Sequence, residues 1–570
     1  MNRLVQGEVG DQLVCLTFLG FLQPHDLHCY SLVCRRSKRL LDQHQERILE
    51  LWHAPVSERR HVWTLFLLVK AYYEQFKSSG MYLWWYSPAC HSKPDFLLSQ
   101  LVRNEIHVPL NPIKAMYCCS WLASYLSWMP QTDVDNAYVK GNTEILDGSE
   151  NSLLLLGTDI VEDKLITELD FENNYLLELP DNIGELVNVD ALVLHDNFLT
   201  ALPQSIVNMT QIHYISLENN LLAEIPSWIG SLRNLTYLNL SRNLICSVPD
   251  SIGSLSDLLT LSLSSNSISS LPDSMANLTQ LEVLQLSENQ LHEFPRLILN
   301  MTDLMHLSMS KNRIKSIPPE IFFLENIEQL ILSENCISFL PEQIGNLRHL
   351  KALNLCNNQL ESLPSSLSRI HSLKYLNIAC NTDLKVSSSL HLPRGMQCLD
   401  VSGCSTEILH ESLNTRVSSL YISFMNLTSI PTKVFSMKLK QLRLEGNHLA
   451  DIPGDILCLG RLELLDISYN KLTEVPDFLN ELKSLRKLIL SGNAIHCLPN
   501  ALLGLHKLRV LDVSGNPLKS WWPVTRMNSL THVELPQSGC NPSDFRRLKS
   551  RFAELRLGGK NNEIMIFSQN

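Results

Sequence analysis

The sequence lacks the features of membrane, secreted and nucleic-acid-binding proteins. No apolar run approaches the ~20 residues of a membrane helix, and the longest contender, Leu65 to Val69, has five. The N-terminus reaches Glu8 and Asp11 without the apolar segment of a secretory signal, so we expect a cytoplasmic location. A net charge of −11 argues against nucleic acid as the main partner. We therefore expect no membrane and no nucleic acid among the partners.

Signals of catalysis and metal binding are also missing. The fifteen cysteines are odd in number and form no paired clusters, which indicates reduced thiols. Cys118 and Cys119 have no matching histidine or second cysteine pair, so we expect no metal site. There is no glycine-rich phosphate loop, no His-Glu-x-x-His and no Gly-x-Ser-x-Gly. Only about 35 residues follow Leu535, too few for a catalytic domain. We expect no enzyme, no catalytic residue and no cofactor.

What the sequence has is a ladder of asparagines. They recur every 23 residues from position 174 to 381 and again from 447 to 516. Each ends a Leu-x-x-Leu-x-Leu-x-x-Asn frame, as at 235–243 and 485–493. Leucines two apart point to one face of a short strand, which places them inside and the intervening residues outside. The Asn side chain is predicted to hydrogen-bond backbone groups of adjacent turns.

The frame resembles the leucine-rich repeat, and the resemblance covers roughly Leu165 to Leu535. We predict an α/β fold: a solenoid of about sixteen coils with a concave parallel sheet, preceded by an all-helical N-terminal region. Proline after the last apolar residue of thirteen repeats favours 3₁₀ or extended segments on the convex side. Residues 381–430 are irregular, and Cys404 and Met425 replace Asn there. This is either local drift or a change of curvature between two binding segments.

The repeats do not fill the chain. We divide it into residues 1–50, 51–145, a solenoid at 146–530 and a C-terminal cap at 531–570. Residues 51–145 hold six of the nine tryptophans, and 57–77 have the apolar spacing of an amphipathic helix.

Residues 13–41 read as three short helices separated by a turn at Pro24. Their apolar positions are Val14, Phe18, Leu19, Leu22, Pro24, Leu27, Leu32, Val33 and Leu40. With Cys34, Arg35 and Arg36, they resemble the F-box, whose family docks this surface on the Skp-type adaptor of a cullin–RING ubiquitin ligase. Two positions depart from the motif: Gly10-Asp11 replaces the usual Leu-Pro, and Ser37 replaces a tryptophan. The alternative is a three-helix cap of the solenoid.

The combination resembles an F-box leucine-rich repeat protein, the substrate receptor of a ubiquitin ligase. The 23-residue Leu-Pro repeat is similar to those of Ras-binding scaffolds and bacterial effectors. The whole is similar to effectors of intracellular bacteria that act on ubiquitination in the host cytoplasm. The alternative is a scaffold outside ubiquitination that binds a small GTPase or a phosphatase.

The target is expected on the concave face, where coil stacking gives a continuous surface. A basic or amphipathic segment would suit the acidic and aromatic set of the first coils. This set is Glu172, His195, Asp196, Tyr214, Glu218, Tyr237 and Arg242. Further exposed positions are Tyr375, Tyr421, Phe424, Arg443, Glu445 and Tyr469. The alternative is that many of these are merely solvated strand residues.

Overall fold

The computed structural model describes residues 145–149, 156, 160–161, 164–385, 391–393, 395–409, 417–536, 542–550, 554–558 and 564–568. The F-box-like motif and nearly all of the tryptophan-rich region lie outside the described residues, so their helices remain predictions. The chain divides into two compact units. Unit 1 holds residues 1–228 and 242–245, and unit 2 holds residues 229–241 and 246–570.

A short strand forms at the Leu-x-Leu step of every coil, because this step alternates buried and exposed side chains with a period of two. The strands of unit 1 are β1 (Ile145–Asp147), β2 (Glu168–Asp170), β3 (Ala191–Val193) and β4 (Tyr214–Ser216). Those of unit 2 are β5 (Tyr237–Asn239), β6 (Thr260–Ser262), β7 (Val283–Gln285), β8 (His306–Ser308), β9 (Gln329–Ile331), β10 (Ala352–Asn354), β11 (Tyr375–Asn377), β12 (Cys398–Asp400), β13 (Ser419–Tyr421), β14 (Gln441–Arg443), β15 (Leu464–Asp466), β16 (Lys487–Ile489), β17 (Val510–Asp512), β18 (His532–Pro536), β19 (Glu554–Gly558) and β20 (Ile564–Ser568). The predicted sixteen repeats correspond to β2–β17.

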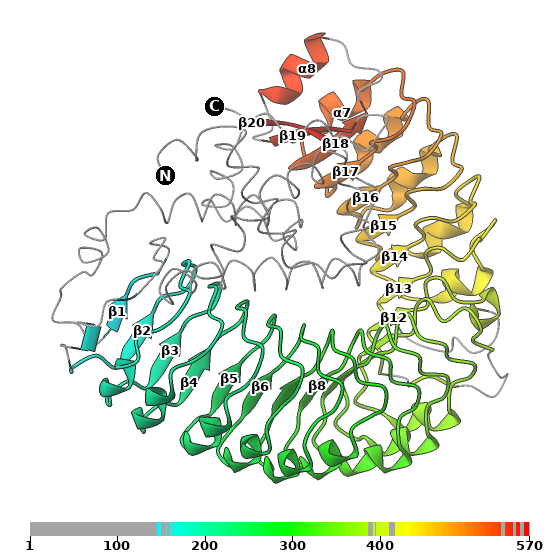
Figure 1. The fold of residues 1–570 in the computed structure, drawn as a ribbon. Coiled ribbons are helices and arrows are strands. Elements are labelled where there is room, and N and C mark those ends of the chain that lie inside the picture. The colour runs from blue at the N-terminus through cyan, green and yellow to red at the C-terminus, as the bar shows by residue number, and fades with distance from the viewer. Residues whose placement is uncertain are drawn as a thin grey trace, which may run out of the picture. The chain divides into compact units, whose positions relative to one another are not determined.

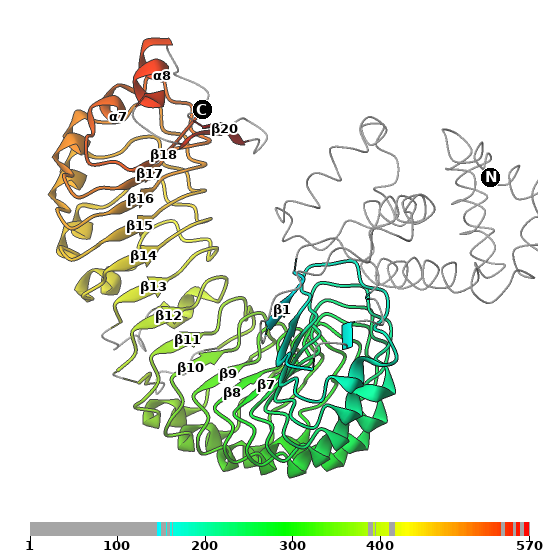
Figure 2. The ribbon, with the colours of Figure 1, turned by 90° about the vertical axis from the view of Figure 1, so that its left-hand side faces the viewer.

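Neighbouring strands pair in parallel within each unit, with the buried residues in register. Leu169 of β2 stands opposite Leu192 of β3 in unit 1, and Leu330 of β9 opposite Leu353 of β10 in unit 2. The pairing continues through the irregular coils, from β11 to β12 and from β12 to β13. Among the strands that the structure describes, the antiparallel pairing is that of β20 with β19. The predicted parallel sheet is thus confirmed, and in unit 2 it lines the inner side of the coil stack (Figures 1 and 2).

Among the described residues, fourteen return segments form a short 3₁₀ helix, as predicted. In most coils a proline directly precedes this turn with φ near its fixed value, as Pro249 does at −74°. These helices are η5 (Ile183–Glu185), η6 (Gln204–Asn208), η7 (Ser227–Ser231), η8 (Asp250–Ser254), η9 (Asp273–Asn277), η10 (Arg296–Asn300), η11 (Pro319–Phe323), η12 (Glu342–Asn346), η13 (Ser365–Arg369), η14 (Thr406–Leu409), η15 (Thr432–Ser436), η16 (Gly454–Cys458), η17 (Asp477–Glu481) and η18 (Asn500–Gly504).

The asparagine ladder makes the hydrogen bonds predicted for it. Asn312 donates from Nδ2 to the Leu286 carbonyl at 2.9 Å and accepts the Leu291 N–H at 2.9 Å, so it ties its own coil to the preceding one. In the irregular region, Cys404 keeps one such bond, from Sγ to the Ile378 carbonyl at 3.1 Å. Asn447 accepts the N–H groups of both Met425 and Leu427 at 3.0 Å. In the coils that lack Asn, backbone groups at the ladder position therefore still have hydrogen-bond partners.

The C-terminal end of the solenoid is closed by α7 (Trp522–Arg526) and β18, with α8 (Pro542–Lys549) beyond them. Trp521 is completely buried at the start of α7. Its ring therefore belongs to the core that α7 covers. The parallel ladder itself continues past residue 530, through β18 to β19.

Candidate functional site

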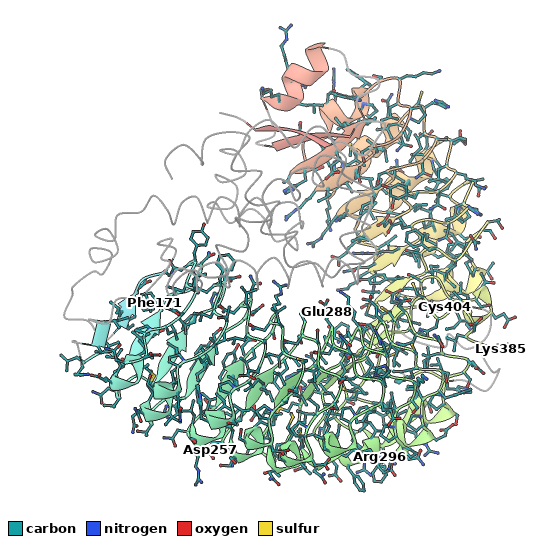
Figure 3. All side chains as sticks on the ribbon, viewed as in Figure 1. Phe171, Asp257, Glu288, Arg296, Lys385 and Cys404 are labelled. Atoms are coloured by element: carbon teal, nitrogen blue, oxygen red, sulfur yellow. The ribbon has the colours of Figure 1, made fainter. Side chains whose placement is uncertain are left out.

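The exposed sheet face is the surface formed by the outward residues of the strands and by the two residues that precede each ladder Asn. Each strand from β2 to β17 buries its central residue and leaves its first residue at least partly exposed, as β2 and β3 do. In Figure 3, Glu288 projects from the strand side of unit 2, whereas Arg296 lies at the 3₁₀ side. A partner that binds along the strands would therefore contact the side chains of this face.

The residue directly before the ladder position has positive φ in every coil, and we call it the left-handed position. In the two units it is occupied by Asn173, Asp196, Asn219, Arg242, Ser265, Glu288, Lys311, Glu334, Asn357, Cys380, Gly403, Phe424, Gly446, Tyr469, Gly492 and Gly515. The sequence-based predictions above do not include this feature. The signal was present, because Asn, Asp and Gly are the residues that adopt this conformation most readily.

Side chains at the left-handed position meet those of the neighbouring coil. Asn219 donates from Nδ2 to Asp196 Oδ1 at 2.5 Å. In unit 2, Glu288 accepts from Ser265 Oγ at 2.9 Å and from Lys311 Nζ at 2.5 Å. The left-handed turn thus aligns polar groups along the ladder direction.

In unit 1, His195 joins two carboxylates. Its Nε2 lies 2.5 Å from Glu172 Oε2, and its Nδ1 lies 2.9 Å from Asp196 Oδ2. Glu172 follows β2, whereas His195 and Asp196 follow β3, so the sheet register brings them together. The three side chains are roughly one-third exposed, which leaves them within reach of a partner.

The electrostatics of this cluster follow from its contacts. The hydrogen bond that His195 donates to Asp196 is the main reason that the pKa of His195 is raised; Glu172 adds to the increase, and partial burial opposes it. For Asp196, burial alone would raise the pKa. The hydrogen bonds from His195 and Asn219 and the charge of Arg242 outweigh burial and lower the pKa. The raised pKa of His195 and the lowered pKa of Asp196 both favour a protonated imidazole beside an ionised Asp196.

The other predicted target residues are arranged more loosely. Arg242 Nε lies 3.7 Å from Glu218 Oε1, and both side chains are well exposed, so this pair contributes little stability. Tyr214 is half-buried at the start of β4. Tyr237 lies on β5 of unit 2, so the structure does not place it with the other six. The predicted adaptor-binding residues all lie outside the described residues.

Within the described part of the chain, no group of three or more His, Cys, Asp or Glu side chains could hold a metal ion. The helices described there are all too short or too polar to cross a membrane.

Leucine-rich repeat families match three parts of the chain. A leucine-rich repeat region matches residues 227–331, and leucine-rich repeat models match 349–370, 415–472 and 461–518. Lumican from Rattus norvegicus is 35% identical over 103 residues, and lumican from Mus musculus is 34% identical. The match spans 17% of this chain and 30% of lumican, so it concerns repeats and not the whole protein.

Two solved structures share the solenoid. A leucine-rich repeat protein of Leptospira interrogans is 28% identical with a TM-score of 0.53, over 69% of this chain and 95% of that one. The ectodomain of the receptor kinase GASSHO1 from Arabidopsis thaliana was solved in complex with Casparian strip integrity factor 2. It has a TM-score of 0.51 at 23% identity, over 81% of this chain and 64% of that one. The fold is therefore a leucine-rich repeat solenoid.

Proposed function

We propose that the protein is a binding receptor that holds a basic segment of a target protein on the exposed sheet face of unit 1. The observation that carries this proposal is the group formed by Glu172, His195 and Asp196. Two carboxylates converge there on one imidazole, at a surface that a partner can reach. The plant ectodomain solved with its ligand supports a protein or peptide as the kind of partner.

The chemistry favours an arginine or lysine of the target. His195 alone already satisfies one oxygen of each carboxylate, but each carboxylate has further lone pairs. A guanidinium can bind a carboxylate through two parallel hydrogen bonds. Tyr214, half-buried on the adjacent strand, offers aromatic area beside the charges.

The binding test is affinity capture with the full chain followed by mass spectrometry. The test variant is Glu172→Gln/Asp196→Asn, which keeps shape and removes charge, and Asn tolerates the left-handed position of residue 196. The matched control is Glu282→Gln, an exposed acid of unit 2. We expect the test variant to lose proteins that the wild type and the control retain. If all three proteins capture the same set at equal strength, the site lies elsewhere.

We further propose that residues 1–50 link this receptor to a Skp-type adaptor, which would make it the substrate-recognition subunit of a cullin ubiquitin ligase. The support is the F-box resemblance carried by Phe18, Leu32 and the Cys34-Arg35-Arg36 run. The setting would be the cytoplasm, or the host cytoplasm if the protein is a bacterial effector.

Coexpression with the adaptor followed by size exclusion tests this link. We expect coelution of the wild type, loss of coelution for Phe18→Ala/Leu32→Ala, and retention for Glu172→Gln/Asp196→Asn. Failure of the wild type to coelute at micromolar concentration would favour the alternative, a scaffold for a small GTPase or phosphatase. In that case the first helices would act only as a cap.

A further inference from the structure

The left-handed position changes character in the last coils of unit 2. From β12 to β17 it reads Gly403, Phe424, Gly446, Tyr469, Gly492 and Gly515. Both aromatic side chains are more than half exposed, Phe424 at 58% and Tyr469 at 53%. Large aromatic residues usually gain their stability from burial, so these two positions need a different explanation.

Both aromatic residues are also strained. Phe424 has φ of 55° and Tyr469 has φ of 50°, a region that bulky side chains rarely adopt. The same position takes Asn in other coils, for example Asn357, at less cost. Strain of this kind is most often found where a side chain serves binding.

Each ring is seated on a glycine of the next coil. A Cβ on Gly446 would overlap Cε1 and Cδ1 of the Phe424 ring. A Cβ on Gly492 would lie 2.6 Å from Cδ1 of Tyr469. The two glycines therefore hold the rings against the backbone on one side, and the exposed fractions leave the remaining surface of each ring open to solvent.

A carboxylate lies in the coil between the two rings. Glu445 directly precedes Gly446, and its carbonyl accepts the N–H of Phe424 at 2.8 Å. Burial raises the pKa of Glu445; Asp466 adds to the increase, and Arg443 opposes it. Within the described residues Glu445 makes no salt bridge, and the Arg443 guanidinium instead stacks 4.8 Å from the centre of the Tyr421 ring.

We propose that Phe424, Tyr469 and Glu445 form a second binding site, for cationic side chains of an extended partner segment. Aromatic faces carry negative potential and attract arginine or lysine. Glu445 is partly buried and directly precedes the glycine on which the Phe424 ring rests, so we infer that a ligand on this ring also approaches the Glu445 carboxylate. A neutral apolar ligand would remove water from that carboxylate without replacing its hydrogen bonds, whereas a cation would pair with it.

The spacing of the rings defines a probe. They belong to coils two apart, and strands lie about 4.8 Å apart, so the rings are separated by roughly 10 Å. A segment in the extended polyproline II conformation has three residues per turn and rises about 3.1 Å per residue, so two arginines three residues apart point to the same side and lie about 9 Å apart. The probe is a fluorescein-labelled Arg-Gly-Gly-Arg peptide, with citrulline in place of both arginines as the neutral control of the same shape.

The experiment measures binding of both peptides to the full chain by fluorescence anisotropy, together with thermal melting of each variant. We expect the arginine peptide to bind at least about tenfold more tightly than the citrulline peptide. Phe424→Asn, Tyr469→Asn and Glu445→Gln should each weaken binding about three- to tenfold. The matched control is Tyr375→Ala, which removes an exposed tyrosine of the same face that is 51% exposed. It should bind as the wild type does.

Asparagine suits the left-handed position, so the two ring variants should melt at or above the wild-type temperature. A fall in melting temperature for them would assign the rings a structural role and overturn the proposal. Equal binding of the arginine and citrulline peptides, or unchanged binding by the three variants, would overturn it as well. The unit 1 variant Glu172→Gln/Asp196→Asn should bind the arginine peptide normally. Loss of binding by this variant would show that the peptide binds at the unit 1 site of the proposed function, and it would refute a second site.

Discussion

Replacement of Asn335 by leucine tests whether the ladder bonds hold neighbouring coils together. Asn335 is 7% exposed. Its Nδ2 donates to the carbonyls of Met309 at 2.9 Å and Leu332 at 3.1 Å. Its Oδ1 accepts the N–H of Ile314, in the preceding coil, at 3.0 Å.

The consequences for these partners differ. The Met309 carbonyl also accepts from Asn312, and the Leu332 carbonyl also accepts from Asn358, so each keeps one bond in the variant. The Ile314 N–H has only Asn335 and would be left buried without an acceptor. One such orphan costs about 1–3 kcal/mol, and with the lost amide bonds we expect about 2–4 kcal/mol in total.

Urea unfolding measures the total, and amide hydrogen exchange locates it. Because each coil contacts only its neighbours, faster exchange should be confined to the coils around Ile314. The control is Gln329→Leu, the same new side chain at an exposed position of β9, where we expect a change within about 0.5 kcal/mol. If Asn335→Leu costs less than about 1 kcal/mol and leaves exchange at Ile314 unchanged, the ladder bonds do not stabilise the stack as argued.

Three further predictions concern stability. His195→Ala should destabilise the protein more at about pH 5.5 than at about pH 9. The pKa of His195 is raised in the folded state, so its contacts stabilise the fold below the unfolded-state pKa, and this stability is lost as the pH rises through the folded-state pKa. A larger loss of unfolding free energy at about pH 9 than at about pH 5.5, measured by urea unfolding, would contradict this. Gly446→Ala should cost about 1–2 kcal/mol, since φ is +66° and the Phe424 ring occupies the space, whereas Gly460→Ala meets nothing within 4 Å and should be neutral in the same assay. Trp521→Ala, at a fully buried position, should cost about 3–5 kcal/mol, and Trp522→Ala, at 45% exposure, should cost much less in thermal unfolding.

The repeat period made the coil predictable from sequence. Leucines two apart and an Asn at a fixed distance fit one arrangement, in which the leucines are buried and the Asn amide is hydrogen-bonded. The parallel strands and the 3₁₀ segments on the opposite side could therefore be predicted from the sequence. Pro249 and its equivalents fixed where the return begins. The irregular coils were located but not explained, because the bonds of Cys404 and Asn447 depend on which backbone groups lie nearby.

The candidate site was predictable only as a set of exposed positions. Periodicity placed Glu172, His195 and Asp196 on one face, but it could not give the rotamers that join them. From the sequence, Glu172 and Asp196 are expected to stand beside His195 as acidic groups for a target, and in the structure both carboxylates contact that histidine directly. Tyr237, grouped with them by spacing, belongs to the other unit.

The left-handed position connects the fold to partner binding, because residue types differ in the energy that they need to adopt a positive φ. Asn219 and Gly515 adopt positive φ readily. Glu288 and Lys311 do not, but they contact each other at 2.5 Å across neighbouring coils, which offsets part of the strain. The rings of Phe424 and Tyr469 rest against the glycine of the next coil, and both residues leave more than half of their surface exposed to water. Since contacts within the described chain offset so little of their strain, the contact that compensates it is best sought in a partner.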